Sequence, residues 1–494
     1  MTHGSQKSDR PIVPMKSANK AGVPAAEPME ERGRTKGNAD RQSTDRTQSR
    51  EAVSQAQGRI RGAVNRNGTE RLTALFHHLN IDVLRGAFFA LNKNASAGID
   101  KETWADYEQE REPRLRDLHA RLHRGAYRAL PSRRVMIPKP DGGERPLGIA
   151  AIEDKIVQMA VVMILTPIYE AEFLGFSYGF RPGRSQHDAL DALAYGLKSR
   201  SIAWILDADI RAFFDKISHE WLIRFVEHRI ADKRIVRLIV KWLKAGVLDD
   251  NKRIRTKEGT PQGAVISPLL ANVYLHYVYD VWVAAWRKRR ATGAMIVVRY
   301  ADDTVVGFQH KDDADAFRRD LDERLAKFAL ELNGEKTRLI AFGRFVAERR
   351  KARGERKPDT FDFLGFTHIC GSKRNGKGFQ LHRKTRRGRK WTLIKRVAEG
   401  LRRIRHRPID EQGRWLAKVL QGHYGYFSVP TNLWSVRAVR HHIKVRWYLS
   451  LRRRSQRARR MTWRRMNVIV ARWLPQPSVT HPWPEQRFLV KHRR

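Results

Sequence analysis

Two adjacent acidic residues, Asp302 and Asp303, interrupt a strongly apolar stretch of the chain, MIVVRYADDTVVGF (residues 295–308). Val, Ile and Phe on both sides favour β-strands, whereas Asp is a poor strand former. The pattern therefore predicts a β-hairpin that carries the two carboxylates at its tip. Two interpretations stay open at this point: an ordinary exposed turn, or a site at which the carboxylates bind a cation.

A third carboxylate, Asp209, follows another apolar segment in the same way. Residues 202–206, IAWIL, have strand character and lead directly into DADIRAFFD. If this strand is a neighbour of the hairpin, Asp209, Asp302 and Asp303 converge at one edge of a sheet. Unpaired carboxylates in such a cluster repel one another, and some of their pKa values rise. Two Mg²⁺ ions about 3.5–4 Å apart, with Mn²⁺ as the alternative, would make the cluster a phosphoryl-transfer centre.

Helical segments separate the expected strands. One begins at Ser267, an expected N-cap, with Pro268 at the first helical position. Its apolar residues recur at the spacing of a buried helix face; they are Leu269, Leu270, Val273, Tyr274, Tyr277, Val278 and Val281. A second amphipathic helix is expected over residues 314–332 and a further strand over residues 361–366. Strands and helices in this non-repeating order predict an α+β fold.

The overall charge of the chain is unusual for its length. With 494 residues it is long enough for two or three domains, and 98 Lys+Arg against 52 Asp+Glu give a net charge of +46. Such a charge requires a polyanionic partner, either nucleic acid or an anionic membrane surface. The sequence has no apolar run long enough to span a bilayer and no apolar signal-peptide core. Its single cysteine, Cys370, excludes internal disulfides and a cysteine-based zinc site. We therefore expect a cytoplasmic nucleic-acid-binding protein.

The positive charge is concentrated towards the C-terminus. Residues 371–494 contain 34 basic and 4 acidic residues together with seven of the 13 tryptophans. Basic and aromatic residues in a helical pattern predict folded helices with a cationic face that contacts phosphates and unpaired bases. The alternative is that most of these tryptophans belong to the core. Residues 1–68, with 13 basic and 7 acidic residues and almost no aromatics, are predicted to be disordered.

The order of the motifs resembles that of a reverse transcriptase. The matching segments are AGID (97–100), IPKPDGGERPLGI (137–149), DIRAFFD (209–215), TPQGAVISPLLAN (260–272), YADD (300–303), LNGEKT (332–337) and FDFLGF (361–366). Two more segments are similar to the group II intron-encoded branch of this family: FSYGFRPGRS (176–185), and LAKVLQGHYGYF (416–427) of its maturase or thumb domain. The resemblance implies a right-hand polymerase fold, with fingers and palm built on an antiparallel sheet and followed by an α-helical thumb/maturase domain.

The resemblance also implies roles for residues near the three aspartates, which would hold two metal ions. Lys336 would protonate the leaving pyrophosphate, a surface lysine being the alternative. Arg181 and Arg184 would bind template or nucleotide phosphates.

Four more residues are implied to bind the incoming nucleotide. Lys139 and Arg145 would clamp its triphosphate, the alternative being solvated loop charges. Gln262 would contact its sugar or base, the alternative being a structural residue at a helix start. Phe214 would exclude a ribose 2′-hydroxyl and so favour deoxynucleotides, the alternative being a core phenylalanine.

Four segments and a set of partners follow from the resemblance. The segments are a disordered basic segment (1–68), fingers and palm (69–370), thumb/maturase (371–460) and a basic nucleic-acid-binding tail (461–494). The implied partners are a group II intron RNA, an RNA template with a DNA primer, dNTPs and target DNA. The implied location is the bacterial cytoplasm, in a ribonucleoprotein associated with the nucleoid. No membrane and no zinc are expected as partners. Alternatives are a protein with maturase function only, or a reverse transcriptase of a retron-like or diversity-generating lineage.

Many members of this branch carry an HNH endonuclease with paired cysteines near the C-terminus. No cysteine follows Cys370. We therefore expect no HNH domain and no second-strand cleavage.

Overall fold

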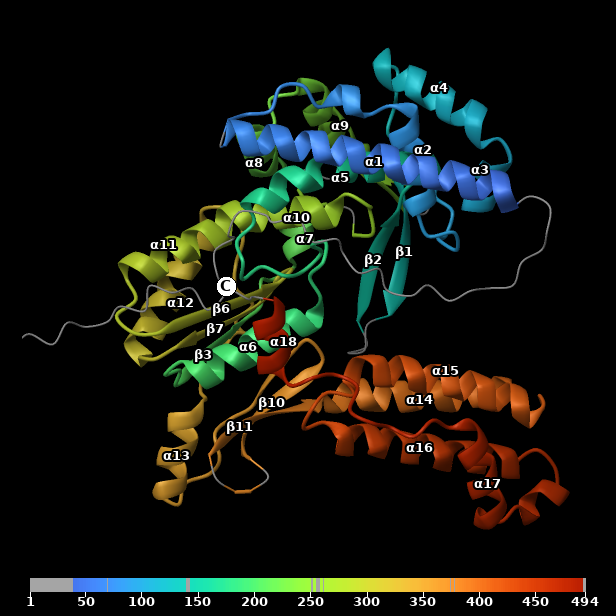
Figure 1. Cartoon of the computed structure of the whole chain (residues 1–494), viewed down its shortest axis with the longest axis vertical. Coiled ribbons are helices and arrows are strands. Elements are labelled where there is room, and N and C mark those ends of the chain that lie inside the picture. The colour runs from blue at the N-terminus through green and yellow to red at the C-terminus, as the bar shows by residue number, and fades with distance from the viewer. Residues whose placement is uncertain are drawn as a thin grey trace, which may run out of the picture.

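The computed structural model describes residues 39–491, except 69, 139–142, 250–251, 255–257, 261, 374 and 377. Figure 1 shows a larger body, in which helices surround β-sheets, and a helical layer at the lower right formed by residues 387–473. Each part has its own apolar core. The mixture of sheets and helices confirms the predicted α+β class.

A four-stranded antiparallel sheet, here called the central sheet, carries the predicted hairpin. Its strands are β3 (Trp204–Ala208), β6 (Met295–Tyr300), β7 (Asp303–Phe308) and β8 (Arg338–Ala341), in the order β6-β7-β3-β8. β6 and β7 form the hairpin, in which Tyr300 lies opposite Asp303, and β3 is the other neighbour of β7. The condition under which the three aspartates converge, that the two segments are neighbours, is therefore met.

Two long helical segments cover the central sheet. The helix α12 (Lys311–Ala326) ends earlier than the amphipathic helix expected over residues 314–332, and its apolar residues Phe317, Leu321 and Leu325 are buried. The other segment consists of α10 (Ser267–Leu275), a π-helical turn (His276–Asp280) and α11 (Val281–Arg289).

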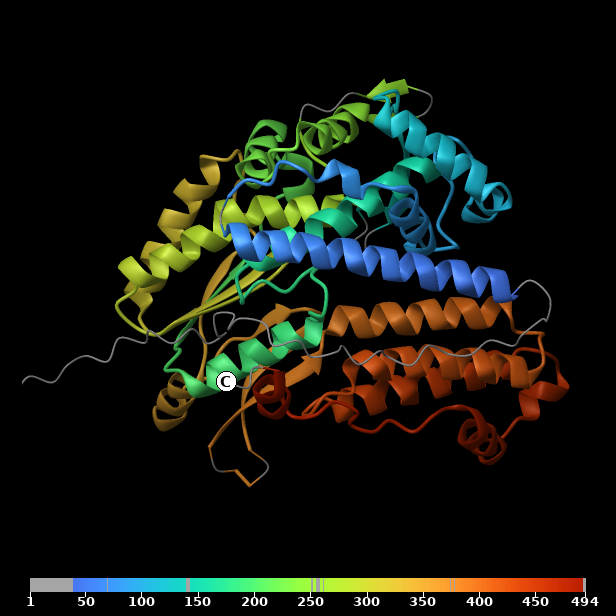
Figure 2. The same cartoon turned by 45° about the horizontal axis from the view of Figure 1, so that its top comes forward.

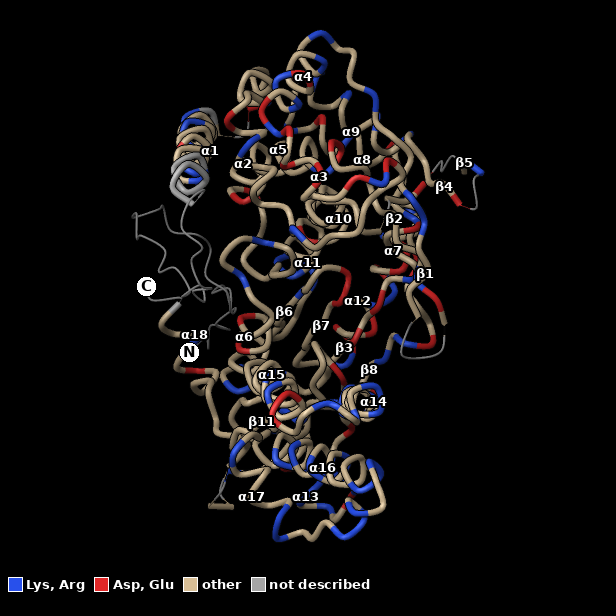
Figure 3. The backbone as a smooth tube through the Cα atoms, turned by 90° about the vertical axis from the view of Figure 1, so that its right-hand side faces the viewer, with Lys and Arg blue, Asp and Glu red and all other residues tan. Residues whose placement is uncertain are grey.

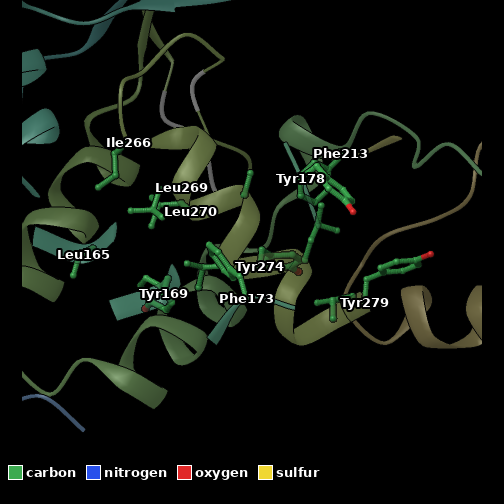
Figure 4. Packing of buried hydrophobic residues seen from close by; sticks show 14 of the residues in the cluster. Leu165, Tyr169, Phe173, Tyr178, Phe213, Ile266, Leu269, Leu270, Tyr274 and Tyr279 are labelled. Atoms are coloured by element: carbon green, nitrogen blue, oxygen red, sulfur yellow. The ribbon is translucent and has the colours of Figure 1, made fainter. Parts of the chain in front are cut away.

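The second of these segments corrects two expectations. Ser267 is its first helical residue rather than its cap, and the cap position is occupied by Ile266. Leu269, Leu270 and Tyr274 are buried as predicted, and Figure 4 shows them close to Tyr169 and Phe173. Val281, in contrast, is 46% exposed. The reason is the π-helical turn, which adds a residue and rotates the following positions.

A second sheet is largely half-exposed or exposed, and its β1–β2 hairpin projects from the helical region (Figure 1). Its strands are β1 (Ser132–Pro138), β2 (Glu144–Ile149), β4 (Val247–Asp249) and β5 (Lys252–Ile254), in the order β2-β1-β4-β5. The helices of this region are α2 (Ile81–Ala90), α3 (Trp104–Gln109), α4 (Arg111–His123), α5 (Ile152–Glu172), α8 (His219–Arg229) and α9 (Lys233–Ala245).

The prediction of disorder for residues 1–68 is wrong for its second half. Residues Ala39–Asn67 form the long helix α1, which Figure 2 shows in blue across the body of the molecule and which packs on α2 and α5. Ala56, Ile60 and Val64 lie one turn apart and are buried. This short apolar stripe packs the helix against the body, although the polar composition of the segment predicted disorder. Residues 1–38 lie outside the described part.

The predicted boundary at residue 370 falls inside a strand. Strands β9 (Phe361–Phe363), β10 (Phe366–Ser372) and β11 (Phe379–Thr385) form a three-stranded sheet, so FDFLGF is the start of a hairpin rather than one strand. The helix α13 (Arg344–Ala352) precedes this sheet. The helical domain begins at α14 (Arg387–Arg403) and continues with α15 (Ile409–Phe427), α16 (Leu433–Arg452) and α17 (Trp463–Trp473).

The residues predicted as a separate tail, 461–494, divide between the two cores. Met466 and Val470 of α17 are buried in the core of the helical domain. The last helix, α18 (Pro484–Lys491), lies against α6 (Gln186–Ser199) of the larger body (Figure 1). There Phe488 stacks on Tyr195, with 4.5 Å between the ring centroids.

Candidate active site

The three aspartates lie at one end of the central sheet. Ala208, the last residue of β3, pairs with Thr304 of β7, so the register brings Asp209 beside Asp303. Asp302 lies in the hairpin loop between Tyr300 and Asp303. The short helix α7 (Phe213–Lys216) follows Asp209.

The carboxylates at this end of the sheet interact electrostatically. Desolvation raises the pKa of Asp302, and the charge of Asp209 adds to this effect. Desolvation, followed by the charges of Asp302 and Asp209, raises the pKa of Asp303 to about 6, although that residue remains exposed on its outer side. These mutual effects indicate that the three carboxylates form one cluster.

Asp209 has a cationic partner in the structure. The Lys336 ammonium lies 3.3 Å from its Oδ2 atom, and the side-chain amide of Asn333 donates to the same oxygen at 3.2 Å. Lys336 is 69% exposed and is therefore free to change its position. Lys336 thus lies beside the aspartates, and its role as a proton donor stays a prediction.

A fourth carboxylate, Asp207, escaped the sequence reasoning. Burial raises its pKa to about 7, an effect that Arg338 opposes and that the charges of Asp303 and Asp209 increase. Arg338 lies 3.8 Å from it. Alternation along β3 places Asp207 and Asp209 on the same face of the sheet, and this spacing of two was the signal that could have revealed it.

The cluster fits a divalent cation by its chemistry. Carboxylate oxygens are the ligands that Mg²⁺ prefers. Burial raises the pKa values of Asp302 and Asp303 most, and the neighbouring carboxylates, whose charges a cation would neutralise, add to the rise. Within the described residues, no three acidic, His or Cys side chains are already arranged to enclose a metal ion. The Oδ2 atom of Asp209 already lies beside the Lys336 ammonium and accepts from Asn333, so a metal ion that used this oxygen would displace Lys336.

Strand β2 of the neighbouring sheet faces the acids. The positive charge of Arg145 lowers the pKa of Asp302, so this exposed guanidinium lies within electrostatic reach of the cluster. The backbone N–H of Gly148 donates to the carbonyl of Gln262 at 2.6 Å, and the Gln262 amide donates to Asp215 at 3.2 Å. Gln262 therefore lies between β2 and the segment that follows Asp209.

Two more residues implied by the resemblance have different outcomes. Phe214 is half-buried and packs edge-on against Phe213, with 5.3 Å between the centroids. It is thus close to Asp209 in the chain without being fully inside the core. Lys139 lies outside the described residues.

The prediction that Arg181 binds substrate is wrong. Its side chain is only 1% exposed and forms a bidentate ion pair with Glu170, at 2.8 and 3.0 Å. The same guanidinium donates to the carbonyls of Leu174 and Ser177. Arg184 donates to the Gly175 carbonyl at 2.6 Å. Both arginines therefore stabilise the loop before α6. The prediction failed because sequence spacing alone does not distinguish a buried guanidinium from an exposed one.

The helical domain has a cationic and partly aromatic surface. Figure 3 shows Lys and Arg along α14, α16 and α17. Among the seven tryptophans of residues 371–494 only Trp447 is fully buried; the exposed ones are Trp391 (42%), Trp434 (74%), Trp463 (43%) and Trp483 (42%). The alternative that most of these tryptophans form the core is therefore wrong. Within the described residues, no helix has the length and apolar character needed to cross a membrane.

Comparison with known proteins identifies the family. Residues 137–368 match the model of the family described as reverse transcriptase (RNA-dependent DNA polymerase). The chain is 35% identical to Protein YkfC of Escherichia coli (strain K12) over 278 residues, which are 49% of this chain and 73% of YkfC.

Two further relatives have names that refer to introns. The chain is 37% identical to the group II intron-encoded protein LtrA of Lactococcus lactis subsp. cremoris over 222 residues, which are 43% of this chain and 36% of LtrA. It is 27% identical to nuclear intron maturase 1, mitochondrial, of Arabidopsis thaliana over 111 residues, which are 22% of this chain and 15% of that protein. These matches, together with the cluster of aspartates in the central sheet, place the chain in the family of group II intron-encoded reverse transcriptases and maturases, with a central domain of the RNA-directed DNA polymerase class.

Proposed function

We propose that the protein extends a DNA primer along an RNA template at the aspartate cluster of the central sheet. The observation that carries this proposal is the convergence of Asp209, Asp302 and Asp303 at the adjacent ends of β3 and β7. In this assignment the central sheet is the palm, the sheet of β1 and β2 belongs to the fingers, and the helical domain is the thumb. Two Mg²⁺ ions held by the three aspartates would supply activation of the primer 3′-hydroxyl and neutralisation of charge on the departing pyrophosphate.

The residues around the cluster have matching tasks. Arg145 presents an exposed guanidinium on the side of β2 near Asp302, where it can bind the triphosphate of a dNTP. Gln262 is fixed between β2 and the segment after Asp209 and can contact the sugar or base. Phe214 would limit the space at the 2′ position of the sugar. Loss of the Asp209 salt bridge would release the Lys336 ammonium towards the triphosphate, where it could donate a proton to pyrophosphate.

The direct test is incorporation of dNTPs on a primed RNA template in the presence of Mg²⁺. We expect activity in the wild type and a loss of about 10³-fold or more in Asp302→Ala, the size of effect typical when a group that stabilises transition-state charge is removed. Asp312→Ala is the matched control, because Asp312 is an exposed acid in α12, beyond the other end of β7. An inactive wild type would refute the proposal, and so would an Asp302→Ala variant with wild-type activity.

A second role, binding of a group II intron RNA as a maturase and support of intron insertion into target DNA, rests on the helical domain. Its exposed tryptophans lie among basic side chains, and aromatic rings beside cations are suited to unpaired bases and phosphates. Binding of structured RNA should weaken steeply with salt. We expect Trp434→Ala to reduce RNA affinity by about 5- to 100-fold, corresponding to the loss of one stacked base. Unchanged affinity, or affinity independent of salt, would refute this role.

A further inference from the structure

The loop that carries Asp302 has a backbone conformation that normally requires glycine. Tyr300 and Asp303 are paired, so only Ala301 and Asp302 form the loop. Ala301 has a φ of +56°, in the left-handed region that alanine avoids because of its Cβ atom. Such strain persists only where the surroundings impose it. The loop must therefore be held by its neighbours.

The segment before α6 provides one part of this support. The N–H of Arg299 donates to the carbonyl of Phe176 and the N–H of Tyr178 to the carbonyl of Arg299, both at 2.9 Å. Gly179 follows at once, and a Cβ atom there would lie 2.3 Å from the backbone nitrogen of Ala301. The absence of a side chain at Gly179 therefore lets this segment contact the loop directly.

The side chain of Arg299 provides the other part. Its guanidinium has five N–H groups, and all five have acceptors: both carboxylate oxygens of Asp280, at 2.7 and 2.5 Å, the side-chain oxygens of Ser177 (2.7 Å) and Asn272 (3.1 Å), and the carbonyl of Ala301 (2.9 Å). Arg299 and Asp280 are 1% and 0% exposed. One buried guanidinium thus ties the strained loop residue to α10, to the segment before α6 and to Asp280.

The π-helical turn explains how an acidic residue reaches this place. A regular helix from Ser267 onward would turn Val281 into the interior, whereas the turn His276–Asp280 exposes Val281 and buries Asp280. Turns of this kind are rare and often occur at functional sites. Here the turn places the carboxylate of Asp280 against Arg299, the residue that directly precedes the YADD motif.

We propose that the buried Arg299–Asp280 pair fixes the strained conformation of Ala301 and thereby the position of Asp302 and Asp303 for metal ions and primer. Arg299 and Asp280 are positioning residues, since both are buried and act through the loop. This inference rests on the proposed polymerase function. It differs from a purely structural role, because the geometry of the loop, and not only the stability of the fold, depends on the pair.

The decisive variant is Asp280→Asn, which keeps the shape of the side chain and removes its charge. In the full-length protein we expect faster amide hydrogen exchange in the peptide covering residues 300–304 and about tenfold weaker binding of Mn²⁺, measured by calorimetry without nucleotide. We expect kcat for dNTP incorporation to fall by about 10- to 100-fold, as for other small displacements of catalytic groups, while KM for dNTP changes less than about twofold. Arg299→Lys, which keeps the charge without the planar fork, should show the same pattern.

Arg229→Lys is the matched control. Arg229 is also buried and is paired with Glu172, and it bonds to the carbonyls of Gly68 and Glu70 rather than to the loop. We expect this variant to lower Tm and to leave hydrogen exchange in the loop, Mn²⁺ affinity and kcat unchanged. If Asp280→Asn does not fold, Ser177→Ala removes a single acceptor of Arg299 and should show the same changes to a smaller extent.

Two results would separate the possible errors. If Asp280→Asn, or Ser177→Ala in its place, lowers Tm but leaves the loop exchange, the Mn²⁺ affinity and kcat at wild-type values, the pair is purely structural and the inference is wrong. If the wild type fails to incorporate dNTPs, the proposed function is wrong. In that case the hydrogen exchange of residues 300–304 still decides whether the pair holds the loop.

Discussion

Replacement of Phe488 by alanine should release the last helix from the larger body. Phe488 is 5% exposed and stacks on Tyr195 of α6. Truncation of a buried phenylalanine costs about 3–5 kcal/mol. The Lys198–Glu485 pair, 2.6 Å long, is partly exposed and contributes at most about 1 kcal/mol. A loss of about 3 kcal/mol shifts the docking equilibrium of α18 by more than about 100-fold.

Hydrogen exchange measured by mass spectrometry can follow this release. In Phe488→Ala we expect faster exchange in α18 and in the face of α6 that it covers, whereas Leu489→Ala serves as the matched control, since Leu489 is 52% exposed on the same helix. Asp191 should keep its partner Arg383, 3.1 Å away, after it loses Arg487. Equal protection of α18 in both variants would refute the view that Phe488 holds this helix in place.

Three further predictions concern stability. Burial raises the pKa of Asp154 to about 6 from 3.8, so its stabilising contribution is complete below about pH 4 and is lost as the pH rises through 6. Relative to Asp154→Asn, the wild type should therefore lose about 3 kcal/mol of unfolding free energy between pH 4 and 8. A difference in unfolding free energy that does not depend on pH would contradict this prediction. Arg181→Lys should lower Tm in calorimetry because its fork with Glu170 is lost, but should leave KM for dNTP unchanged; an increased KM would restore a substrate-binding role. Ile60→Ala should weaken the packing of α1 by about 2–5 kcal/mol and expose this helix to limited proteolysis, while resistance equal to that of the wild type would show that α1 is held by other contacts.

The local parts of the fold were predictable because their signals lie close together in the chain. Apolar runs of strand-forming residues around Asp302 and Asp303 define the hairpin, and a regular apolar spacing defines α12. The adjacency of β3 and β7, in contrast, was only a condition for the convergence of the acids, and the structure meets it. For these elements, propensity and burial favour the same structure.

The parts that were missed depend on contacts between distant segments. The π-helical turn before Val281 is stabilised by Asp280 and Arg299, which are 19 residues apart, and helical periodicity alone predicts a regular helix there. The stripe of Ile60 and Val64 becomes significant only once α2 and α5 lie beside it. The resemblance implied that Arg181 binds phosphate, and its ion pair with Glu170 could not be foreseen because Glu170 lies 11 residues earlier on another element. Sequence patterns do not contain this information.

The docking of α18 has a consequence for the synthesis of the protein. Arg487 pairs with Asp191, which precedes it by 296 residues. At a typical elongation rate of about 5–20 residues per second, α6 leaves the ribosome about 15–60 s before α18 can reach it. During that time Tyr195 and the carboxylate of Asp191 lack their C-terminal cover. The larger body can therefore reach its final packing only after translation is nearly complete, and chains that end early would present an uncovered apolar surface to chaperones and proteases.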